Sequence, residues 1–242
     1  MKMAEVTIPE MVRNGTMSAE MAAVIWAAVD EQVSFLTVAI PRFAGKTTTS
    51  NAALALRAPH VPLHWVDGRP AHMEQLKQQR TGGYLAVEEF DRAPMPGYIW
   101  GEPVRRVFET VATGGYALQA VLHAHSVEQA VQLVTEGNGV NDEHASVFKL
   151  ILYIERFGSD YSSFWRRLTN IYEVHKVEGG KPIGHPLFSW NRTADRFEKL
   201  MDPHQWAQDR AGLARRAELM SSLANAGRTS SEEVAAALAQ FR

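Results

Sequence analysis

The segment 33–39, Val-Ser-Phe-Leu-Thr-Val-Ala, is almost wholly apolar and rich in β-branched residues. Such a run predicts a central parallel strand that is covered on both faces. An amphipathic helix predicted at 18–30 precedes it, and the loop 40–45 leads from it directly into a helical segment that starts at Lys46. The immediate succession of buried strand, loop and helix favours a fold in which parallel strands alternate with helices.

The same alternation continues along the chain. Further strands are predicted at 60–66, 84–87, 116–122 and 150–154, with helices at 71–80, 102–113, 127–135 and 142–149. We therefore predict an α/β fold with a mostly parallel sheet. Beyond Phe157 the pattern changes to two strands, 167–176 and 186–190, joined through the turn 179–182, and then to two helices, 210–225 and 230–241.

These changes of pattern divide the chain into four segments. Its 242 residues fit one large domain, or one domain with a small appendage, at the usual ~150 residues per domain. We predict an N-terminal segment with a lead-in helix at 1–32, an α/β core at 33–157, a β-rich extension at 158–200 and a C-terminal helical segment at 201–242.

Charge and composition exclude several classes of function. The chain has 25 Lys and Arg against 27 Asp and Glu, so no overall field attracts nucleic acid or anionic lipid. The absence of cysteine excludes disulfides, cysteine-ligated zinc and thiol nucleophiles. No signal peptide is visible, and no apolar stretch approaches the ~20 residues that span a bilayer. We expect a cytoplasmic protein with no nucleic-acid partner and no membrane span.

The sharpest local motif is Ala44-Gly45-Lys46-Thr47-Thr48, which lies between the first buried strand and a helix. In a P-loop, backbone N–H groups at the helix N-terminus bind phosphate oxygens, the lysine reaches the outer phosphates, and the next hydroxyl ligates Mg²⁺. Lys46 and Thr47 fit these roles, and Ala44 to Thr48 are the predicted nucleotide-binding residues.

The loop departs from the full P-loop pattern at its start. Ile40 stands where the first glycine is expected, and Phe43 and Ala44 replace glycines that are often found inside the loop. Bulky residues at such positions must reshape the loop, because glycine alone reaches left-handed dihedral angles without steric cost. An ordinary helix N-terminus with a solvated Lys46 therefore stays open as an alternative.

An acidic segment, 88–91, follows the predicted strand 84–87. The end of such a strand is where a carboxylate can reach Mg²⁺ and orient the attacking water in a P-loop enzyme. Glu88 is the predicted catalytic and Mg²⁺-binding acid, and a solvated acidic turn is the alternative.

Histidines follow the next strand, at His123 and His125. His123 is predicted to contact a γ-phosphate, whereas a zinc pair is disfavoured because closed zinc sites generally use four ligands. The histidines elsewhere show no metal-ligand spacing, and this group includes His144, His175, His185 and His204. The pair Arg166-Arg167 is interpreted as a solvated strand end.

Taken together, these motifs resemble the ATPase superfamily of type II and type IV secretion and type IV pilus assembly, in its C-terminal RecA-like motor domain. The segment 45–54 is similar to the family's GK[ST]T motif and following helix, and 87–92 to its Walker B segment. The segments 113–116 and 121–126 resemble its His box, with His123 as the second histidine. The segments 167–174 and 187–191 resemble two later strands.

The resemblance implies a RecA-like core over 33–157 and a catalytic cycle on Mg²⁺-ATP. Lys46, Glu88 and His123 are the implied catalytic residues, with Thr47 and Glu88 at the Mg²⁺ and Asp67 and Asp91 as supporting residues. It also implies self-assembly into a ring, usually a hexamer, and recruitment to the inner face of the membrane by membrane-embedded secretion or pilus proteins.

Two other functions stay open from the sequence. A degenerate subunit that binds without hydrolysing, with a structural or regulatory role, is favoured by the missing loop glycines. A P-loop kinase acting on a small molecule is disfavoured because no lid or acceptor site is visible. Acceptor-dependent release of ADP would identify a kinase.

Overall fold

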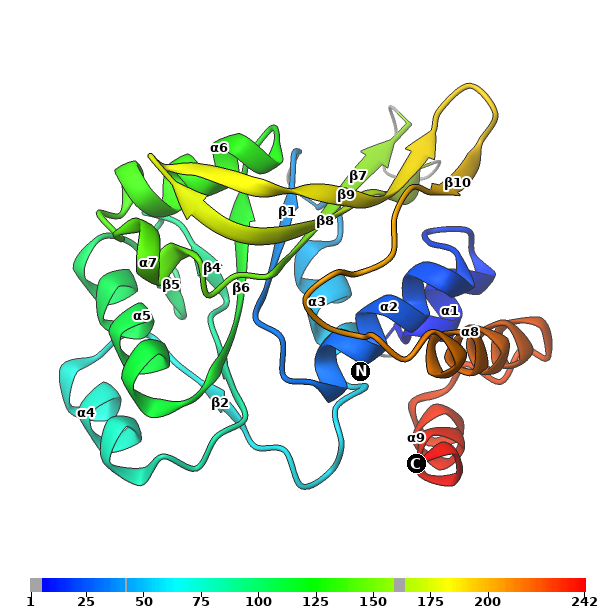
Figure 1. The fold of residues 1–242 in the computed structure, drawn as a ribbon, viewed down its shortest axis with the longest axis horizontal. Coiled ribbons are helices and arrows are strands. Elements are labelled where there is room, and N and C mark those ends of the chain that lie inside the picture. Colours follow the sequence, from blue (N-terminus) through cyan, green and yellow to red (C-terminus); the bar gives the residue numbers. More distant parts are fainter. Residues whose placement is uncertain (1–5, 42, 159–163) are drawn as a thin grey trace.

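The fold is built around a mixed eight-stranded sheet (Figure 1). The computed structural model describes residues 6–41, 43–158 and 164–242. The strand order is β10-β9-β8-β7-β1-β6-β3-β2. The consecutive strands from β7 to β2 are parallel to one another. These five strands are β7 (Leu150–Phe157), β1 (Phe35–Ala39), β6 (Ala117–His123), β3 (Tyr84–Ala86) and β2 (Leu63–Trp65). The predicted α/β class with a mostly parallel sheet is confirmed.

Helices cover both faces of this sheet, and alternate residues of β1 point into two separate cores. Phe35 packs with one set of helices and Leu36 with the other. The first set is α1 (Ile8–Arg13), α2 (Ala19–Asp30), α3 (Lys46–Leu54), α8 (Arg210–Asn225) and α9 (Ser231–Phe241). The second is α4 (Pro70–Gln79), α5 (Glu102–Gly114), α6 (Val127–Gln132), the π-helix η1 (Leu133–Gly137) and α7 (Asp142–Ala145).

Local capping explains why the best-predicted helices begin where they do. Ser18 caps α2 by accepting a hydrogen bond from the Met21 amide at 3.3 Å. Ser230 and Glu233 form a complete capping box at the start of α9. Sequence periodicity did not predict three short elements: α1, the two-residue strand β4 (Glu89–Phe90) and its partner β5 (Tyr98–Ile99). It predicted the first residues of η1 only as the end of the helix at 127–135. Elements this short carry too few residues for a periodic pattern.

Antiparallel strands extend the sheet beyond β7. They are β8 (Trp165–Glu178), β9 (Lys181–Asn191) and β10 (Arg196–Lys199), of which β10 was not predicted. The long β8–β9 hairpin turns at Gly179 and Gly180 and contains register shifts, one of them between Val174 and Lys176. Gly184 is required in β9 because a Cβ there would lie 1.9 Å from the Glu173 carbonyl oxygen.

Segments from opposite ends of the chain pack together beside α2. Arg216 of α8 and Arg242 both bind Asp30, at 3.1 and 2.8 Å. The rings of Trp26 and Phe241 lie 4.6 Å apart. The C-terminal helices are therefore held against the core by buried aromatic packing and by paired charges at the end of α2.

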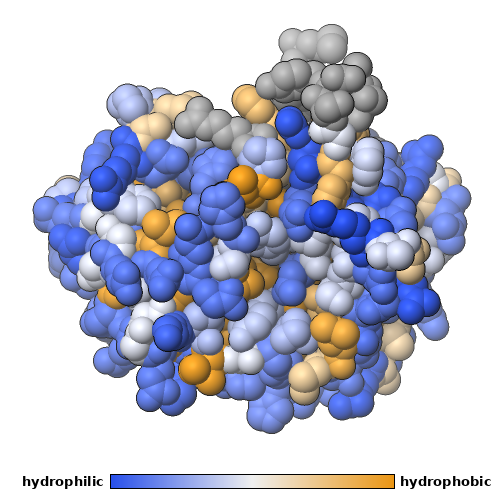
Figure 2. Space-filling model, turned by 90° about the horizontal axis from the view of Figure 1, so that it is seen from above, coloured by the Kyte–Doolittle hydropathy of each residue, from blue (hydrophilic) through white to orange (hydrophobic). Residues whose placement is uncertain are grey.

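The molecular surface mixes hydrophilic and hydrophobic side chains. On the face shown in Figure 2, hydrophobic residues form scattered spots between hydrophilic ones. Large exposed apolar side chains occur at separate places in the chain, such as Phe43, Met95 and Ile183. Isolated exposed apolar residues are ordinary on protein surfaces. Within the described ranges, no helix combines the length and the apolar character needed to cross a bilayer.

Candidate functional site

The carboxyl ends of three parallel strands meet at one edge of the sheet. Ala39 at the end of β1 is in register with His123 at the end of β6, and β3 lies on the far side of β6. The acidic segment 88–91 follows β3 at this edge. In open α/β sheets, ligands bind outside the carboxyl ends of the strands. The residues gathered here are therefore candidates for binding and chemistry.

The Gly45-Lys46 step places an ammonium group at the start of α3. Gly45 caps the helix with φ +102°, a left-handed conformation that glycine adopts without strain. A Cβ at Gly45 would also lie 3.0 Å from Cδ of Arg166. Ser50 donates to the Thr37 hydroxyl at 2.8 Å, which fixes α3 on β1. Lys46 is the first residue of the helix, and only 6% of it is exposed.

Lys46, Glu89 and His123 form a compact cluster from three elements. Nζ of Lys46 lies 3.3 Å from Oε1 of Glu89 and 2.8 Å from Nε2 of His123. His123 Nε2 is in turn 3.2 Å from Glu89 Oε1. Burial, and then the Lys46 charge, lower the pKa of His123. A neutral imidazole with its proton on Nδ1 donates to the Ala39 carbonyl oxygen at 3.3 Å and accepts from Lys46.

Glu89, which was not singled out from the sequence, is the carboxylate of this cluster. It is 4% exposed and pairs in register with Tyr98 of β5. Burial, and then a hydrogen bond to the Glu89 carboxylate, raise the pKa of Tyr98 to about 12. Adjacent residues of an extended segment point to opposite faces. A sequence that reads Glu88-Glu89 after a strand therefore cannot show which carboxylate faces the lysine.

Glu88 lies on the other side of this segment and is half-buried. A Cβ at Gly97 would lie 2.6 Å from its Cγ, so the Glu88 stem packs on the backbone at Gly97. Burial, and then the neighbouring Glu89 charge, raise the pKa of Glu88. A carboxyl group with a raised pKa suits general-base chemistry near neutral pH. The catalytic role of Glu88 stays a prediction.

The other predicted site residues fall into two groups. Ala44 is buried, whereas Thr47 and Thr48 are exposed in the first turn of α3. Asp67 follows β2, the edge strand beside β3, and its carboxylate binds Arg69 at 2.8 Å. Asp91 accepts a hydrogen bond from the Ala93 amide at 2.7 Å.

Comparison with known proteins gives distant relatives. No protein-family model matches the chain. An uncharacterized protein of Methanocaldococcus jannaschii is 24% identical over 217 residues, which cover 78% of this chain and 77% of that protein. The crystal structure of the VirB11 ATPase from the Brucella suis type IV secretion system, in complex with sulphate, matches 64% of this chain with a TM-score of 0.45 and 12% identity. This chain spans about half of that structure, 52% of its length.

Arg166 supplies a second cationic group beside the loop. The interpretation of Arg166-Arg167 as a solvated strand end is wrong. Nη2 of Arg166 donates to the Phe43 carbonyl oxygen at 3.1 Å, and burial lowers the Arg166 pKa. Arg167 instead binds Asp195 at 3.0 Å. The Gly45 loop therefore lies between two cations, Lys46 inside it and Arg166 over it, an arrangement that can hold an anion.

His125 does not join His123 in a common contact in the part of the chain that the structure describes. His123 belongs to the Lys46 cluster, while the His125 side chain is exposed. The group of metal-ligand type and spacing among the described residues is instead Glu173, His175 and His185. Sequence spacing assigned these histidines no role, because two strands bring them together across a bulged hairpin.

Proposed function

We propose that this chain binds Mg²⁺-ATP at the turn from Gly45 to Thr48 and hydrolyses it, as a motor subunit of a type II/IV secretion or type IV pilus-like apparatus. One observation carries the proposal. A buried lysine at the start of the helix after β1 meets Glu89 and His123 at the carboxyl edge of parallel strands, within 3.3 Å. A RecA-like core over 33–157 is part of the proposal.

Each element of the cluster has a defined task in this proposal. The first amides of α3 and the Lys46 ammonium bind the phosphates, whose negative charge replaces Glu89 as the counter-ion of Lys46. Lys46 and His123 then face the charge that develops on the transferred phosphoryl group. Glu88 orients and deprotonates the attacking water, and Glu89 is the rival for that role because it faces Lys46 directly.

The residues of the turn fit Mg²⁺ by donor type. Thr47 offers an exposed hydroxyl beside Lys46, and Glu88 offers a carboxylate, which are the oxygen donors that Mg²⁺ prefers. When bound, Mg²⁺ neutralises phosphate charge and acts as a Lewis acid. Asp67 and Asp91 are supporting residues of the same proposal.

The wider proposal concerns assembly and place in the cell. The resemblance of 45–54, 87–92 and 121–126 to secretion and pilus ATPases supports self-assembly into a ring, usually a hexamer. It also supports a cytoplasmic location at the inner face of the membrane, held there by membrane-embedded secretion or pilus proteins.

A non-hydrolysing subunit with a structural or regulatory role is the second candidate function. The loop before Gly45 contains Phe43, a bulky residue at φ +66° whose side chain is 67% exposed. Lys46 is already neutralised by Glu89, so phosphate has to displace a buried ion pair. These two features favour weak binding without turnover.

Mg²⁺-ATP binding and turnover by the full chain, at concentrations that permit assembly, test the proposal. We expect saturable binding that is lost in Lys46→Ala. Turnover should be lost in Glu88→Gln if Glu88 is the base, and in Glu89→Gln if its rival Glu89 is the base. Lys77→Ala, a lysine on α4 that pairs with Glu109 at 3.8 Å, is the matched control and keeps both activities. Binding without turnover favours the second candidate, and absence of binding overturns the nucleotide proposal for the isolated chain.

A further inference from the structure

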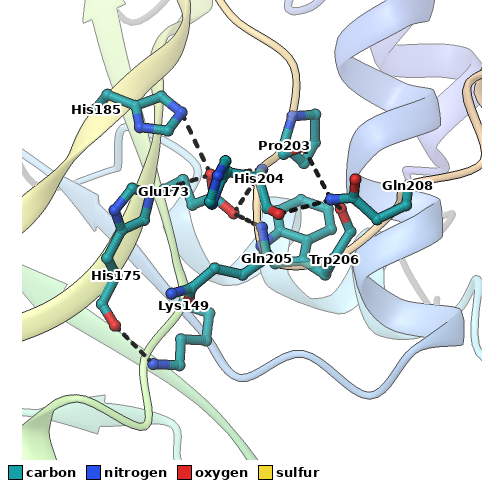
Figure 3. Close-up of polar contacts among 9 residues, drawn as sticks. All are labelled: Lys149, Glu173, His175, His185, Pro203, His204, Gln205, Trp206 and Gln208. Atoms are coloured by element: carbon teal, nitrogen blue, oxygen red, sulfur yellow. Dashed lines mark hydrogen bonds and ion pairs between the residues drawn. The ribbon is translucent and has the colours of Figure 1, made fainter.

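A second cluster of titratable residues lies on the β8–β9 hairpin, outside the proposed nucleotide site (Figure 3). Glu173 and His175 are two residues apart on β8, which places them on the same face of the strand. His185 of β9 pairs in register with Glu173. His175 itself falls at the register shift between Val174 and Lys176, and such bulges re-aim a side chain. The hairpin therefore directs two imidazoles toward one carboxylate.

The Glu173 carboxylate is fully buried, with 0% exposure. It accepts hydrogen bonds from the backbone amide of His204, at 3.1 and 2.8 Å to its two oxygens, and from that of Gln205 at 3.0 Å. Lys149 lies nearby but donates to the His175 carbonyl oxygen at 2.9 Å (Figure 3). No lysine or arginine in the described ranges lies within ion-pair distance of Glu173. A buried carboxylate that no lysine or arginine contacts directly is unfavourable.

The two imidazoles facing Glu173 lie at similar distances from the same carboxylate oxygen. Nε2 of His175 and Nε2 of His185 lie 3.5 and 3.3 Å from Oε2 of Glu173. Both nitrogen atoms are buried, and neither has a hydrogen-bond partner among the described residues. Tetrahedral zinc with bonds of about 2.0–2.1 Å separates its ligand atoms by about 3.4 Å. The observed spacing is therefore that of metal ligands, and it is longer than the usual N–H···O hydrogen bond of about 2.9 Å.

We propose that Glu173, His175 and His185 form a binding site for a divalent transition-metal ion, and that Zn²⁺ is the ion it prefers. Two imidazole nitrogens and one carboxylate oxygen suit zinc, whereas Mg²⁺ and Ca²⁺ require oxygen ligands. The three ligand atoms all lie within 4.8 Å of one another, so the rings turn inward slightly when the ion binds.

The fourth coordination position lies beside His204. The His204 side chain is exposed, and its ring centroid lies 5.5 Å from that of His175 (Figure 3). A change of its rotamer brings the imidazole to the ion, and a water molecule fills the position otherwise. Because Glu173 also holds the backbone of His204 and Gln205, the ion would fasten the connection to α8 onto the β8–β9 hairpin.

Metal analysis of the full chain tests the site directly. The protein is stripped with a chelator, incubated without nucleotide in Zn²⁺, Co²⁺ or Mg²⁺, and dialysed. We expect one Zn²⁺ retained per chain, a visible absorption band of four-coordinate Co²⁺, and no retained Mg²⁺. Zinc at 100-fold above its dissociation constant should raise the melting temperature by about 5 °C or more. No retention of zinc, or an equal effect of Mg²⁺, overturns the proposal.

Variants locate the bound ion. His175→Ala and His185→Ala should each weaken zinc binding by about 100-fold or more, since even loss of an outer-shell partner weakens binding 10- to 100-fold. His60→Ala, which removes an exposed histidine elsewhere, is the matched control and should bind zinc normally. Lys46→Ala should also keep zinc, so failure of this proposal and of the nucleotide proposal are distinguishable. Normal zinc binding in folded His185→Ala, checked by circular dichroism, overturns the assignment.

Discussion

Two buried carboxylates stand in similar surroundings on different sheets, Glu89 on β4 of the small two-stranded sheet and Glu173 on β8 of the eight-stranded sheet. Both face histidine, and both are closed off from solvent, at 4% and 0% exposure. Glu89 has the Lys46 ammonium at 3.3 Å, whereas Glu173 has backbone amides and the imidazoles of a hairpin. A side-chain cation and a set of N–H donors are therefore alternative ways to hold a buried carboxylate, and each leaves room for a different ligand. In the proposals made above, Glu89 releases its cation to a phosphate and Glu173 binds a metal ion.

Removing the cation from the first region should have the largest effect. Lys46→Ala leaves Glu89 buried without its ammonium, and loss of one partner of a buried ion pair costs about 3–5 kcal/mol. Urea denaturation, with the exposed-lysine variant Lys176→Ala as control, measures the difference. The double variant Lys46→Ala with Glu89→Gln should recover part of the lost stability. A loss of under about 1 kcal/mol in Lys46→Ala would show that Glu89 is held by its other contacts.

Removing the carboxylate from the second region should have the next largest effect. Glu173→Ala leaves the amides of His204 and Gln205 without their acceptor, at about 1–3 kcal/mol for each unsatisfied donor. Two such donors sum to roughly 2–6 kcal/mol, and because His204 and Gln205 are exposed residues we expect the lower part of this range, about 2–4 kcal/mol, in chemical denaturation of the metal-free protein. Glu178→Ala, on the same strand but exposed, should change stability by less than about 0.5 kcal/mol. Equal losses of stability in Glu173→Ala and Glu178→Ala would show that burial and the two amide hydrogen bonds give Glu173 no special contribution.

Substitution of the loop glycine should have a smaller effect. Gly45→Ala forces a side chain into φ +102° and brings Cβ to 3.0 Å from Arg166. Strain of this kind costs of order 1–3 kcal/mol. Gly227→Ala, at φ +66° and with no atom within 4 Å of the new Cβ, separates backbone strain from the contact with Arg166. Equal losses at both positions in thermal denaturation would mean that the Arg166 contact contributes nothing.

The smallest effect should be a pH dependence confined to the first region. Because the pKa of folded His123 is lowered below its ordinary value near 6.5, the unfolded chain binds more protons in this window. The His123 contribution is therefore complete above pH 6.5 and declines as the pH falls toward the folded pKa. His123→Gln should flatten the stability profile below pH 6.5, whereas His60→Ala should leave it unchanged. An unaltered profile in His123→Gln contradicts the neutral imidazole inferred beside Lys46.

The sequence predicts the first region far better than the second. Lys46 and His123 stand at a helix start and a strand end, both of which are local patterns, and parallel strands bring such ends to one edge. The sequence could not choose between Glu88 and Glu89, because that choice depends on which face of a two-residue strand points inward. The second region depends on hairpin register and a bulge, which join His175 to His185 without any regular spacing. Arg166 was missed for a related reason, since its contact with Phe43 spans 123 residues.

The ion pairs of Asp30 with Arg216 and Arg242 at the end of α2 also affect the synthesis of the chain. Arg242 binds Asp30 across 212 residues, which a ribosome translates in roughly 10 to 40 seconds at 5–20 residues per second. Throughout that interval α8 and α9 are not yet available to cover Trp26 and its apolar neighbours on α2, although all of them belong to one hydrophobic core in the folded chain. Nascent chains stalled before residue 206 should therefore be captured by chaperones and cleaved readily by protease, while chains that have emerged from the ribosome beyond Arg242 should resist both.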